Sequence, residues 1–234
     1  MSKYTHIFFD LDHTLWDFDA NSRETLRELY DSYELSSKLS ARSKDDFVER
    51  YIMHNERMWD LYRQNKLSKG RLRKARFEAV LQDFGLVDKR LAKEIGEEYL
   101  KACPQKTKLN DHALDVVQEL SDSFELHILS NGFHETQLVK LSASGLAPYF
   151  KEVITSERAS AKKPQSRMFM FAERVTGAPK DESLMIGDHV DIDVLGAVNF
   201  GWDAIHFNEF DEEHDYPSVK TLDELMPLIL GKGS

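Results

Sequence analysis

Asp10 and Asp12 stand two residues apart, directly after the apolar run Ile7-Phe8-Phe9. A short, aromatic-rich apolar run of this kind predicts a buried strand. In an open parallel sheet the carboxyl ends of the strands face the ligand crevice, so both carboxylates can be aimed into it. One carboxylate can attack phosphorus while the other handles protons. A turn is the competing interpretation, because Asp and Thr are also frequent in turns.

A second polar segment, Ser130-Asn131-Gly132, follows the apolar run at residues 125–129. A small hydroxyl followed by backbone amides can hold phosphate oxygens. Because Ser-Asn-Gly is also a common turn sequence, its place directly after a strand is what favours a binding role.

Two adjacent lysines, Lys162 and Lys163, come shortly after the strand-like run at residues 152–154. Lysine is a compact point charge suited to phosphate. An exposed lysine pair usually belongs to the solvated surface, and the residues alone leave open which of the two would bind.

A carboxylate-rich segment, Gly187 to Asp193, follows the apolar run at residues 183–186 and contains Asp188 and Asp193. Hard oxygen ligands at a strand end suit magnesium, which takes few protein carboxylates together with waters and substrate phosphate. A nucleophile, a hydroxyl, a lysine and metal-binding carboxylates, each placed after a strand, are the parts that phosphoryl transfer requires.

The elements that must position these residues alternate along the chain. Helical patterns separate most of the strand-like runs, which predicts an α/β fold with a parallel sheet covered on both faces. The predicted strands span residues 4–9, 125–129, 152–154, 183–186 and 203–207, and the predicted helices span residues 113–121, 135–144, 166–175 and 191–199.

The region from residue 18 to residue 107 has no convincing strand pattern. Its apolar residues, among them Phe47, Tyr51 and Tyr62, recur at helical spacing. We therefore expect a core domain made of residues 1–17 and 108–234, and an all-helical domain made of residues 18–107 that is inserted after the first strand.

Composition limits the classes of partner. The 234-residue chain has a formal net charge of -10, so we expect it to repel long nucleic acid. A small phosphorylated metabolite is not excluded, because a metal ion and one lysine can reverse the field inside a pocket. No apolar run approaches the roughly 20 residues of a membrane helix, and the single cysteine, Cys103, fits a reducing compartment. We expect a cytoplasmic protein without membrane partners.

The four segments together resemble the haloacid-dehalogenase-like superfamily over essentially the full length of the chain. The resemblance rests on D-x-D-x-T at Asp10–Thr14, the Ser-Asn-Gly segment, Lys163-Pro164 and the G-D-x-x-x-x-D segment. It implies a Rossmann-like, doubly wound core with an inserted helical cap. It also implies a Mg2+-dependent phosphomonoesterase that works through an aspartyl-phosphate intermediate.

The resemblance implies a role for each matching residue. Asp10 would be the nucleophile, and Asp12 would protonate the leaving alcohol and then activate water. Because Asp12 must be protonated for the first step, its pKa should be raised by burial or by nearby negative charge. The implied phosphate-binding residues are Leu11, Thr14, Ser130, Asn131 and Lys163, with Lys162 as the competitor of Lys163. The implied metal ligands are Asp10, the backbone carbonyl of Asp12, Asp188 and Asp193, the last directly or through water.

Within the superfamily the chain resembles the bacterial pyrimidine 5′-nucleotidases most. The features that carry this resemblance are the run from Ile7 to Leu15, then Asp17-Phe18-Asp19, Asn131-Gly132-Phe133 and the step from Gly145-Leu146 to Tyr149-Phe150. It implies hydrolysis of nucleoside monophosphates such as UMP, dUMP and dTMP. We expect the protein to be a monomer or dimer. The alternatives are a sugar-phosphate phosphatase or phosphomutase of the same superfamily, a phospho-accepting signalling receiver and an inactive scaffold. The insertion of about 90 residues counts against a receiver, which needs only one compact domain.

Overall fold

The structure, a computed structural model, describes residues 2–40 and 43–230. By its internal contacts the chain divides into two units, Met1–Phe18 with Gln105–Ser234 and Asp19–Pro104. The first unit holds the sheet, and the regular elements of the second, outside residues 41–42, are all helices. Whether the helical unit acts as a cap, as the predicted division into residues 1–17 with 108–234 and 18–107 supposes, stays a prediction.

A parallel sheet in the order β3-β2-β1-β4-β5-β6 forms the centre of the first unit. Its strands are β1 (His6–Phe9), β2 (Glu125–Ser130), β3 (Phe150–Thr155), β4 (Ser183–Gly187), β5 (Asp203–Phe207) and β6 (Ser218–Val219). Five of them match predicted strands, and the doubly wound α/β class is confirmed. The two-residue β6 was not predicted, because it is too short to carry a period-2 pattern.

The middle of the sheet is apolar on both faces, which is why these segments read as continuous apolar runs. Ile7, Phe8 and Phe9 of β1 are each 0% exposed. Neighbouring β4 pairs with β1 along its whole length, from His6 opposite Ser183 to Phe9 opposite Ile186. The two strands therefore end together, and the residues that follow each of them reach the same edge of the sheet.

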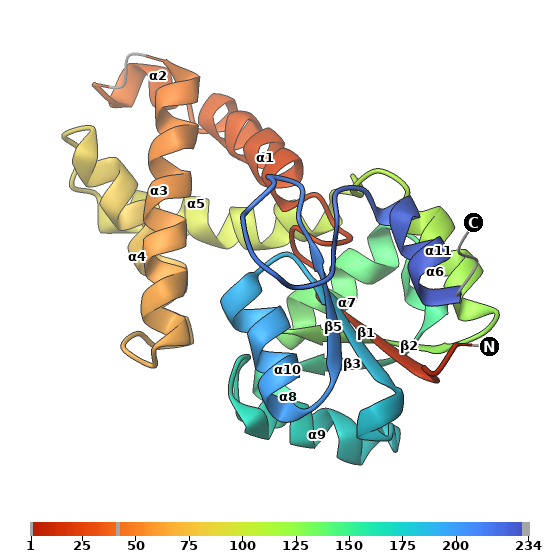
Figure 1. Ribbon diagram of the computed structural model, residues 1–234. Coiled ribbons are helices and arrows are strands. Elements are labelled where there is room, and N and C mark those ends of the chain that lie inside the picture. The colour runs from red at the N-terminus through yellow and green to blue at the C-terminus, as the bar shows by residue number, and fades with distance from the viewer. Residues whose placement is uncertain (1, 41–42, 231–234) are drawn as a thin grey trace. The chain divides into compact units, whose positions relative to one another are not determined.

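Helices cover both faces of this sheet (Figure 1). On the face that Phe8 enters, a buried cluster joins Phe8 to Phe169, Phe200 and Trp202, and the rings of Phe8 and Trp202 are 4.3 Å apart. On the other face α6 packs against β2, α7 against β3, and α11 against α6. The helices of this unit are α6 (Ala113–Ser121), α7 (His134–Ala143), α8 (Ser156–Ala159), α9 (Ser166–Thr176), the π-helical turn η4 (Val190–Val194), α10 (Leu195–Phe200) and α11 (Leu225–Leu230).

The inserted segment folds into helices, as predicted. They are α1 (Phe18–Ser32), α2 (Leu35–Lys38), α3 (Lys44–Arg63), α4 (Lys69–Asp83) and α5 (Lys89–Ala102). Polar side chains cap the amino ends of α3, α4 and α5. Ser43, Ser68 and Asp88, respectively, accept hydrogen bonds from backbone amides of the first turn of these helices. None of the helices within residues 2–40 and 43–230 is both long enough and apolar enough to cross a membrane.

Aromatic residues from three helices form the core of the helical unit. The rings of Tyr51 and Phe77 are 4.8 Å apart, and those of Tyr51 and Tyr99 are 5.2 Å apart. The buried guanidinium of Arg76 lies over Tyr51 and Tyr99 and donates to Asn55 Oδ1 at 2.8 Å. Cation–π contacts and this hydrogen bond compensate the buried charge.

Close packing at the start of α10 gives a stability prediction. A Cβ on Gly196 would lie 3.0 Å from the Cα of Pro164 and 3.0 Å from the ring of Phe169. We expect Gly196→Ala to lower the free energy of unfolding by about 1–3 kcal/mol through overpacking. Gly70→Ala is the matched control, because Gly70 is also the second residue of a helix and has nothing within 4 Å. Urea unfolding of the two variants measures the difference, and a Gly196→Ala protein as stable as the wild type would contradict it.

Candidate active site

The loop after β1 is fixed to the neighbouring strand and to itself by backbone hydrogen bonds. Asp10 N donates to Ile186 O of β4 at 2.9 Å. The carbonyl of Leu11 accepts from Leu15 N at 3.0 Å and from Trp16 N at 2.9 Å. The loop thus turns back on itself immediately after the strand, which holds the Asp10 side chain at the carboxyl end of the sheet.

Lys163 joins two carboxylates, Asp10 directly after β1 and Asp193 in the turn η4 that follows β4. Its ammonium lies 2.6 Å from Asp10 Oδ1 and 2.7 Å from Asp193 Oδ1, and the side chain is buried. Burial would lower the pKa of Lys163, but the charges of Asp10 and Asp193 raise it above its usual value, so the lysine is a cation. The structure therefore places Lys163, rather than Lys162, against the residue predicted to be the nucleophile.

Three carboxylates gather at this edge of the sheet. One oxygen each from Asp10, Asp188 and Asp193 lies within 4.8 Å of the others. Burial above all raises the pKa of Asp10 to about 7; Lys163 opposes this, and the charge of Asp193 adds to it. Burial, together with Asp193 and Asp10, also raises the pKa of Asp188 well above its usual value. One lysine does not neutralise this cluster.

The donor set fits a hard divalent cation such as Mg2+. Carboxylate oxygens are the ligands that this ion takes, and a cation among the three would offset the repulsion that raises the pKa values of Asp10 and Asp188. Asp12 was also expected in the metal set, through its backbone carbonyl. The Asp12 carboxylate is bound by Lys140 and Gln137, so only the backbone carbonyl could be a metal ligand.

Neighbouring groups orient the two carboxylates after β4. The buried hydroxyl of Thr14 donates to Asp188 Oδ1 at 3.0 Å, a contact suited to bracing the loop. Asp193 Oδ2 accepts from His189 N at 3.2 Å, within the turn that leads into α10. The Nε2 of His206, on β5, donates to the backbone carbonyl of Asp188 at 2.8 Å.

Asp12 is held by two residues that the sequence reasoning missed. Lys140 forms an ion pair with Asp12 Oδ1, and Gln137 Nε2 donates to Asp12 Oδ2 at 3.0 Å. Burial alone would raise the pKa of Asp12, but the Lys140 cation and the Gln137 bond outweigh it and lower the pKa. The expectation of a raised pKa is therefore wrong. Lys140, which supplies the opposing charge, lies 128 residues away along the chain, so the sequence around Asp12 gave no sign of it.

Lys140 is buried on α7 and lies over the rings of Trp16, in the loop after β1, and of Phe18, the first residue of α1. Its ammonium is 4.2 Å from the centre of the Trp16 ring and 5.4 Å from that of Phe18. Gln137 and Lys140 occupy the buried side of α7, one turn apart, next to Leu141. A glutamine and a lysine in the stripe where a helix normally carries apolar residues were the signal that could have revealed both.

The Ser130-Asn131-Gly132 segment begins at the last residue of β2 and lies at the same edge of the sheet. Ser130 Oγ accepts from Gly132 N at 3.0 Å and from Gln137 Nε2 at 2.8 Å, so its own proton is left to donate. Asn131 binds the backbone of Lys163 on both sides, accepting from its amide at 2.8 Å and donating to its carbonyl at 3.1 Å. A Cβ on Gly132 would collide with Gln137, which explains the glycine.

Asn110 is a further residue that the sequence reasoning missed. Its side-chain amide donates to the carbonyls of His13 and Thr14 at 2.9 Å each. The bond spans 97 residues to His13, and no local pattern predicts it. It holds the loop that carries Asp10 and Asp12.

Known proteins resemble this chain both in sequence and in structure. The sequence model of a family described as haloacid dehalogenase-like hydrolase matches residues 4–201. PynA, a pyrimidine 5′-nucleotidase of Streptococcus pneumoniae, is 30% identical over 88% of this chain and 84% of its own. YjjG, a pyrimidine 5′-nucleotidase of Escherichia coli, is 27% identical over 88% of this chain and 89% of its own. The structure of YfnB, a HAD-hydrolase of Bacillus subtilis bound to magnesium, has a TM-score of 0.87 at 26% identity and covers 97% of this chain and 99% of that one.

The position of Gly187 gives a prediction about metal affinity. A Cβ on this last residue of β4 would overlap the carboxyl group of Asp193. We expect Gly187→Ala to displace that carboxylate and to weaken Mg2+ binding by about 10–100-fold, the usual effect of disturbing a ligand's support. Asp191→Asn is the control, because Asp191 lies in the same turn but is exposed. Titration calorimetry with Mg2+ tests this, and unchanged affinity in Gly187→Ala would exclude Asp193 from the site.

Proposed function

The chain belongs to the haloacid dehalogenase-like hydrolase family, and on that premise we propose that it is a Mg2+-dependent phosphomonoesterase. Asp10 is the nucleophile, and the reaction passes through an aspartyl-phosphate. The substrates are pyrimidine nucleoside 5′-monophosphates such as UMP, dUMP and dTMP.

The observation that carries the proposal is the pairing of one buried lysine with a buried carboxylate at a strand end. Lys163 lies 2.6 Å from Asp10 Oδ1, and the Ser130 hydroxyl, with a proton left to donate, follows the neighbouring strand. A phosphoryl group next to Asp10 would meet a cation and a hydroxyl donor there. These groups can stabilise the negative charge on the equatorial oxygens of the phosphoryl group. Stabilisation of that charge is the main source of catalysis in phosphoryl transfer.

In the first step Asp10 Oδ attacks phosphorus in line, and the bond from phosphorus to the ribose oxygen breaks. Asp12 gives a proton to that oxygen, so the nucleoside leaves as an alcohol. In the second step Asp12 takes a proton from water, and the water oxygen attacks phosphorus. The acyl-phosphate bond breaks, phosphate leaves, and Asp10 is regenerated.

Mg2+ held by Asp10, Asp188, Asp193 and the Asp12 carbonyl would supply charge stabilisation for the transferring phosphoryl group. Lys163 offsets part of the carboxylate charge and keeps the Asp10 oxygen in place. Asn131 holds the Lys163 backbone, and Thr14 orients Asp188.

The lowered pKa of Asp12 fits the second step directly, because a base must be ionised. For the first step Asp12 must be protonated, and the negative phosphoryl group of a bound substrate would raise its pKa by proximity. Lys140 therefore favours the ionised form of Asp12 before substrate binds, and the charge of the bound phosphoryl group then favours the protonated form. The same carboxylate argues against a dehalogenase, which needs no acid and base for a phosphate ester.

The substrate class rests on resemblance. Two relatives, PynA and YjjG, are named pyrimidine 5′-nucleotidases and match most of the chain. The sequence features from Asp17 to Asp19 and from Asn131 to Phe133 support the same class.

The test is phosphate release from a panel of nucleotides and sugar phosphates, with Mg2+ and with chelator. We expect Mg2+-dependent release, fastest with UMP, dUMP and dTMP. Asp10→Asn should lose essentially all turnover while its unfolding midpoint stays close to that of the wild type, because it removes the nucleophile and keeps its shape. Wild-type activity in Asp10→Asn would refute the mechanism.

Other outcomes of the panel separate the alternatives. Release led by a sugar phosphate keeps the chemistry and replaces the substrate class. Isomerisation of a phosphosugar without phosphate release indicates a phosphomutase. A folded, Mg2+-loaded protein that releases no phosphate from any substrate contradicts the hydrolase assignment itself.

Lys140 gives a second prediction. Lys140→Met should lower kcat by about 10²–10³-fold, the scale of a disturbed acid–base group, with little change in KM. Because Lys140 lowers the pKa of Asp12, its removal should move the acidic limb of the kcat profile to higher pH. Lys140→Arg should restore part of the activity, and Lys151→Met, at an exposed lysine, should have no effect. An unshifted profile in Lys140→Met would show that the lysine does not act through Asp12.

A further inference from the structure

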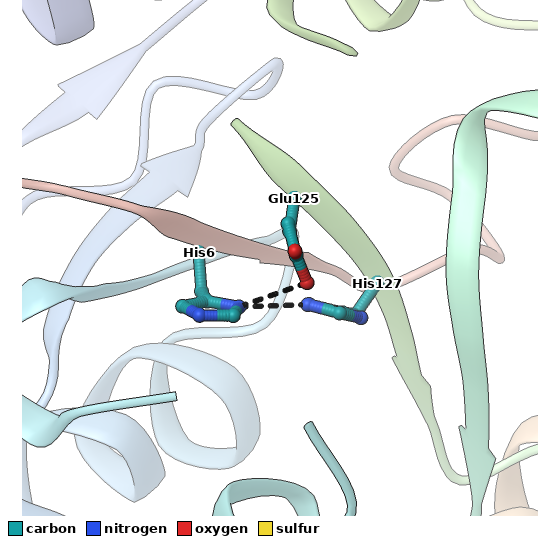
Figure 2. Close-up of side chains that lie close together, drawn as sticks. All are labelled: His6, Glu125 and His127. Atoms are coloured by element: carbon teal, nitrogen blue, oxygen red, sulfur yellow. Dashed lines mark hydrogen bonds and ion pairs between the residues drawn. The ribbon is translucent and has the colours of Figure 1, made fainter. Parts of the chain in front are cut away.

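His6, Glu125 and His127 converge near the amino ends of β1, which leads into Asp10, and β2, which ends at Ser130 (Figure 2). One nitrogen of each histidine and one carboxylate oxygen of Glu125 lie within 4.8 Å of one another. We propose that these three side chains form a second metal site, for a borderline divalent d-block cation of the Zn2+ class. The site is independent of the proposed phosphatase chemistry.

The distances approach those of a single coordination sphere. His6 Nδ1 is 3.0 Å from His127 Nε2 and 3.8 Å from an oxygen of Glu125. Two ligands of one Zn2+ ion lie at most about 4.3 Å apart, since each is 2.0–2.2 Å from the metal. The Glu125 side chain is 56% exposed, so it can move the small distance that brings its carboxylate within reach of an ion bound by His6 and His127.

The sheet itself fixes the two histidines. His6 and Glu125 are the first residues of β1 and β2 and stand opposite each other, while His127 stands opposite Phe8. Because side chains alternate along a strand, Glu125 and His127 project from the same face of β2. His127 is packed between the rings of His6 and Phe8, with ring centres 5.3 Å and 4.8 Å away. Ligands on paired strands need little ordering when a metal binds.

The chemistry of the three groups selects the class of metal. Two imidazoles with one carboxylate suit Zn2+ and its neighbours, whereas Mg2+ prefers oxygen ligands only. Burial, followed by the neighbouring His6, lowers the pKa of His127 to about 3, so its ring is neutral and keeps a lone pair. Three protein ligands leave a fourth position, which water can fill from the exposed side.

A hydrogen bond between the two imidazoles is the alternative to a metal. In that arrangement one proton occupies the space between His6 Nδ1 and His127 Nε2. His127 Nδ1 has no hydrogen-bond partner among the described residues, so the buried ring is incompletely satisfied. The same lack of an acceptor behind a metal-bound imidazole weakens affinity by about 10–100-fold, and we therefore expect modest, micromolar binding.

The proposed site is separate from the carboxylate cluster. His6 begins β1 and Asp10 follows its end, and four residues of strand span roughly 13 Å at 3.3 Å per residue. An ion at His6 would tie together the starts of β1 and β2. It would therefore act as a staple for the strands that position Asp10 and Ser130.

The experiment is calorimetric titration of the full-length protein with Zn2+ in a large excess of Mg2+, which occupies the carboxylate site. We expect one Zn2+ per chain and a rise in the thermal unfolding midpoint with Zn2+ concentration. His6→Asn should weaken binding at least tenfold and abolish the rise. Glu125→Gln, an exposed and isosteric change, should weaken binding without a risk to folding.

Two controls separate this site from other ligands. Asp193→Asn should leave Zn2+ binding intact; loss of binding in that variant would place the ion at the carboxylate cluster and overturn the proposal. His214→Asn should also leave it intact, although His214 Nε2 lies 2.7 Å from His206 Nδ1 in another histidine pair. No Zn2+ binding in the presence of Mg2+, or binding that His6→Asn and Glu125→Gln leave unchanged, would show that the two histidines only share a proton.

Discussion

The contact between Lys163 and Asp10 is the interaction on which the rest of the site depends. Lys163 Nζ also meets Asp193, so one buried cation holds carboxylates that follow two different strands. Without it, three acidic side chains whose oxygens lie within 4.8 Å of one another would face each other with no cation between them. The parallel register of β1 and β4 makes the cluster possible, because both strands end at the same edge. The cluster in turn leaves excess negative charge, which is what a divalent cation requires of a protein site.

Two carboxylates in one loop have opposite electrostatic environments. Burial raises the pKa of Asp10 to about 7, whereas Lys140 and Gln137 lower that of Asp12 although burial opposes them. Separating the pKa values of neighbouring acids is how one site assigns different tasks to them. Here Asp10, proposed as the nucleophile, shares the Lys163 cation with Asp193, whereas Asp12, proposed for proton transfer, pairs with Lys140. Gln137 connects the two halves, since it also binds the Ser130 hydroxyl.

The sequence predicted the doubly wound sheet, the helical insertion and the four segments around the site, because apolar period and strand-end chemistry are local signals. It did not decide between Lys162 and Lys163, since adjacent residues differ only in which way the backbone turns them. Lys140, Gln137 and Asn110 were missed because each acts on the first loop from far along the chain. The expectation of a raised pKa for Asp12 was wrong for the same reason. Burial, which raises this pKa, could be foreseen from the sequence, whereas the charge of Lys140, which lowers it, could not. The roles of the site residues and the substrate stay predictions.

The phosphorylated state of Asp10 is the central claim, and quenched-flow mass spectrometry tests it most directly. An aryl phosphate whose phenolate leaves without a proton should phosphorylate the Asp12→Asn protein, while loss of the base slows the second step. We predict that acid quenching traps one phosphoryl group per chain, mapped to the peptide that contains Asp10, and none in an Asp10→Asn/Asp12→Asn protein. Release of phosphate with no covalent adduct, or an adduct on another residue, would contradict the account.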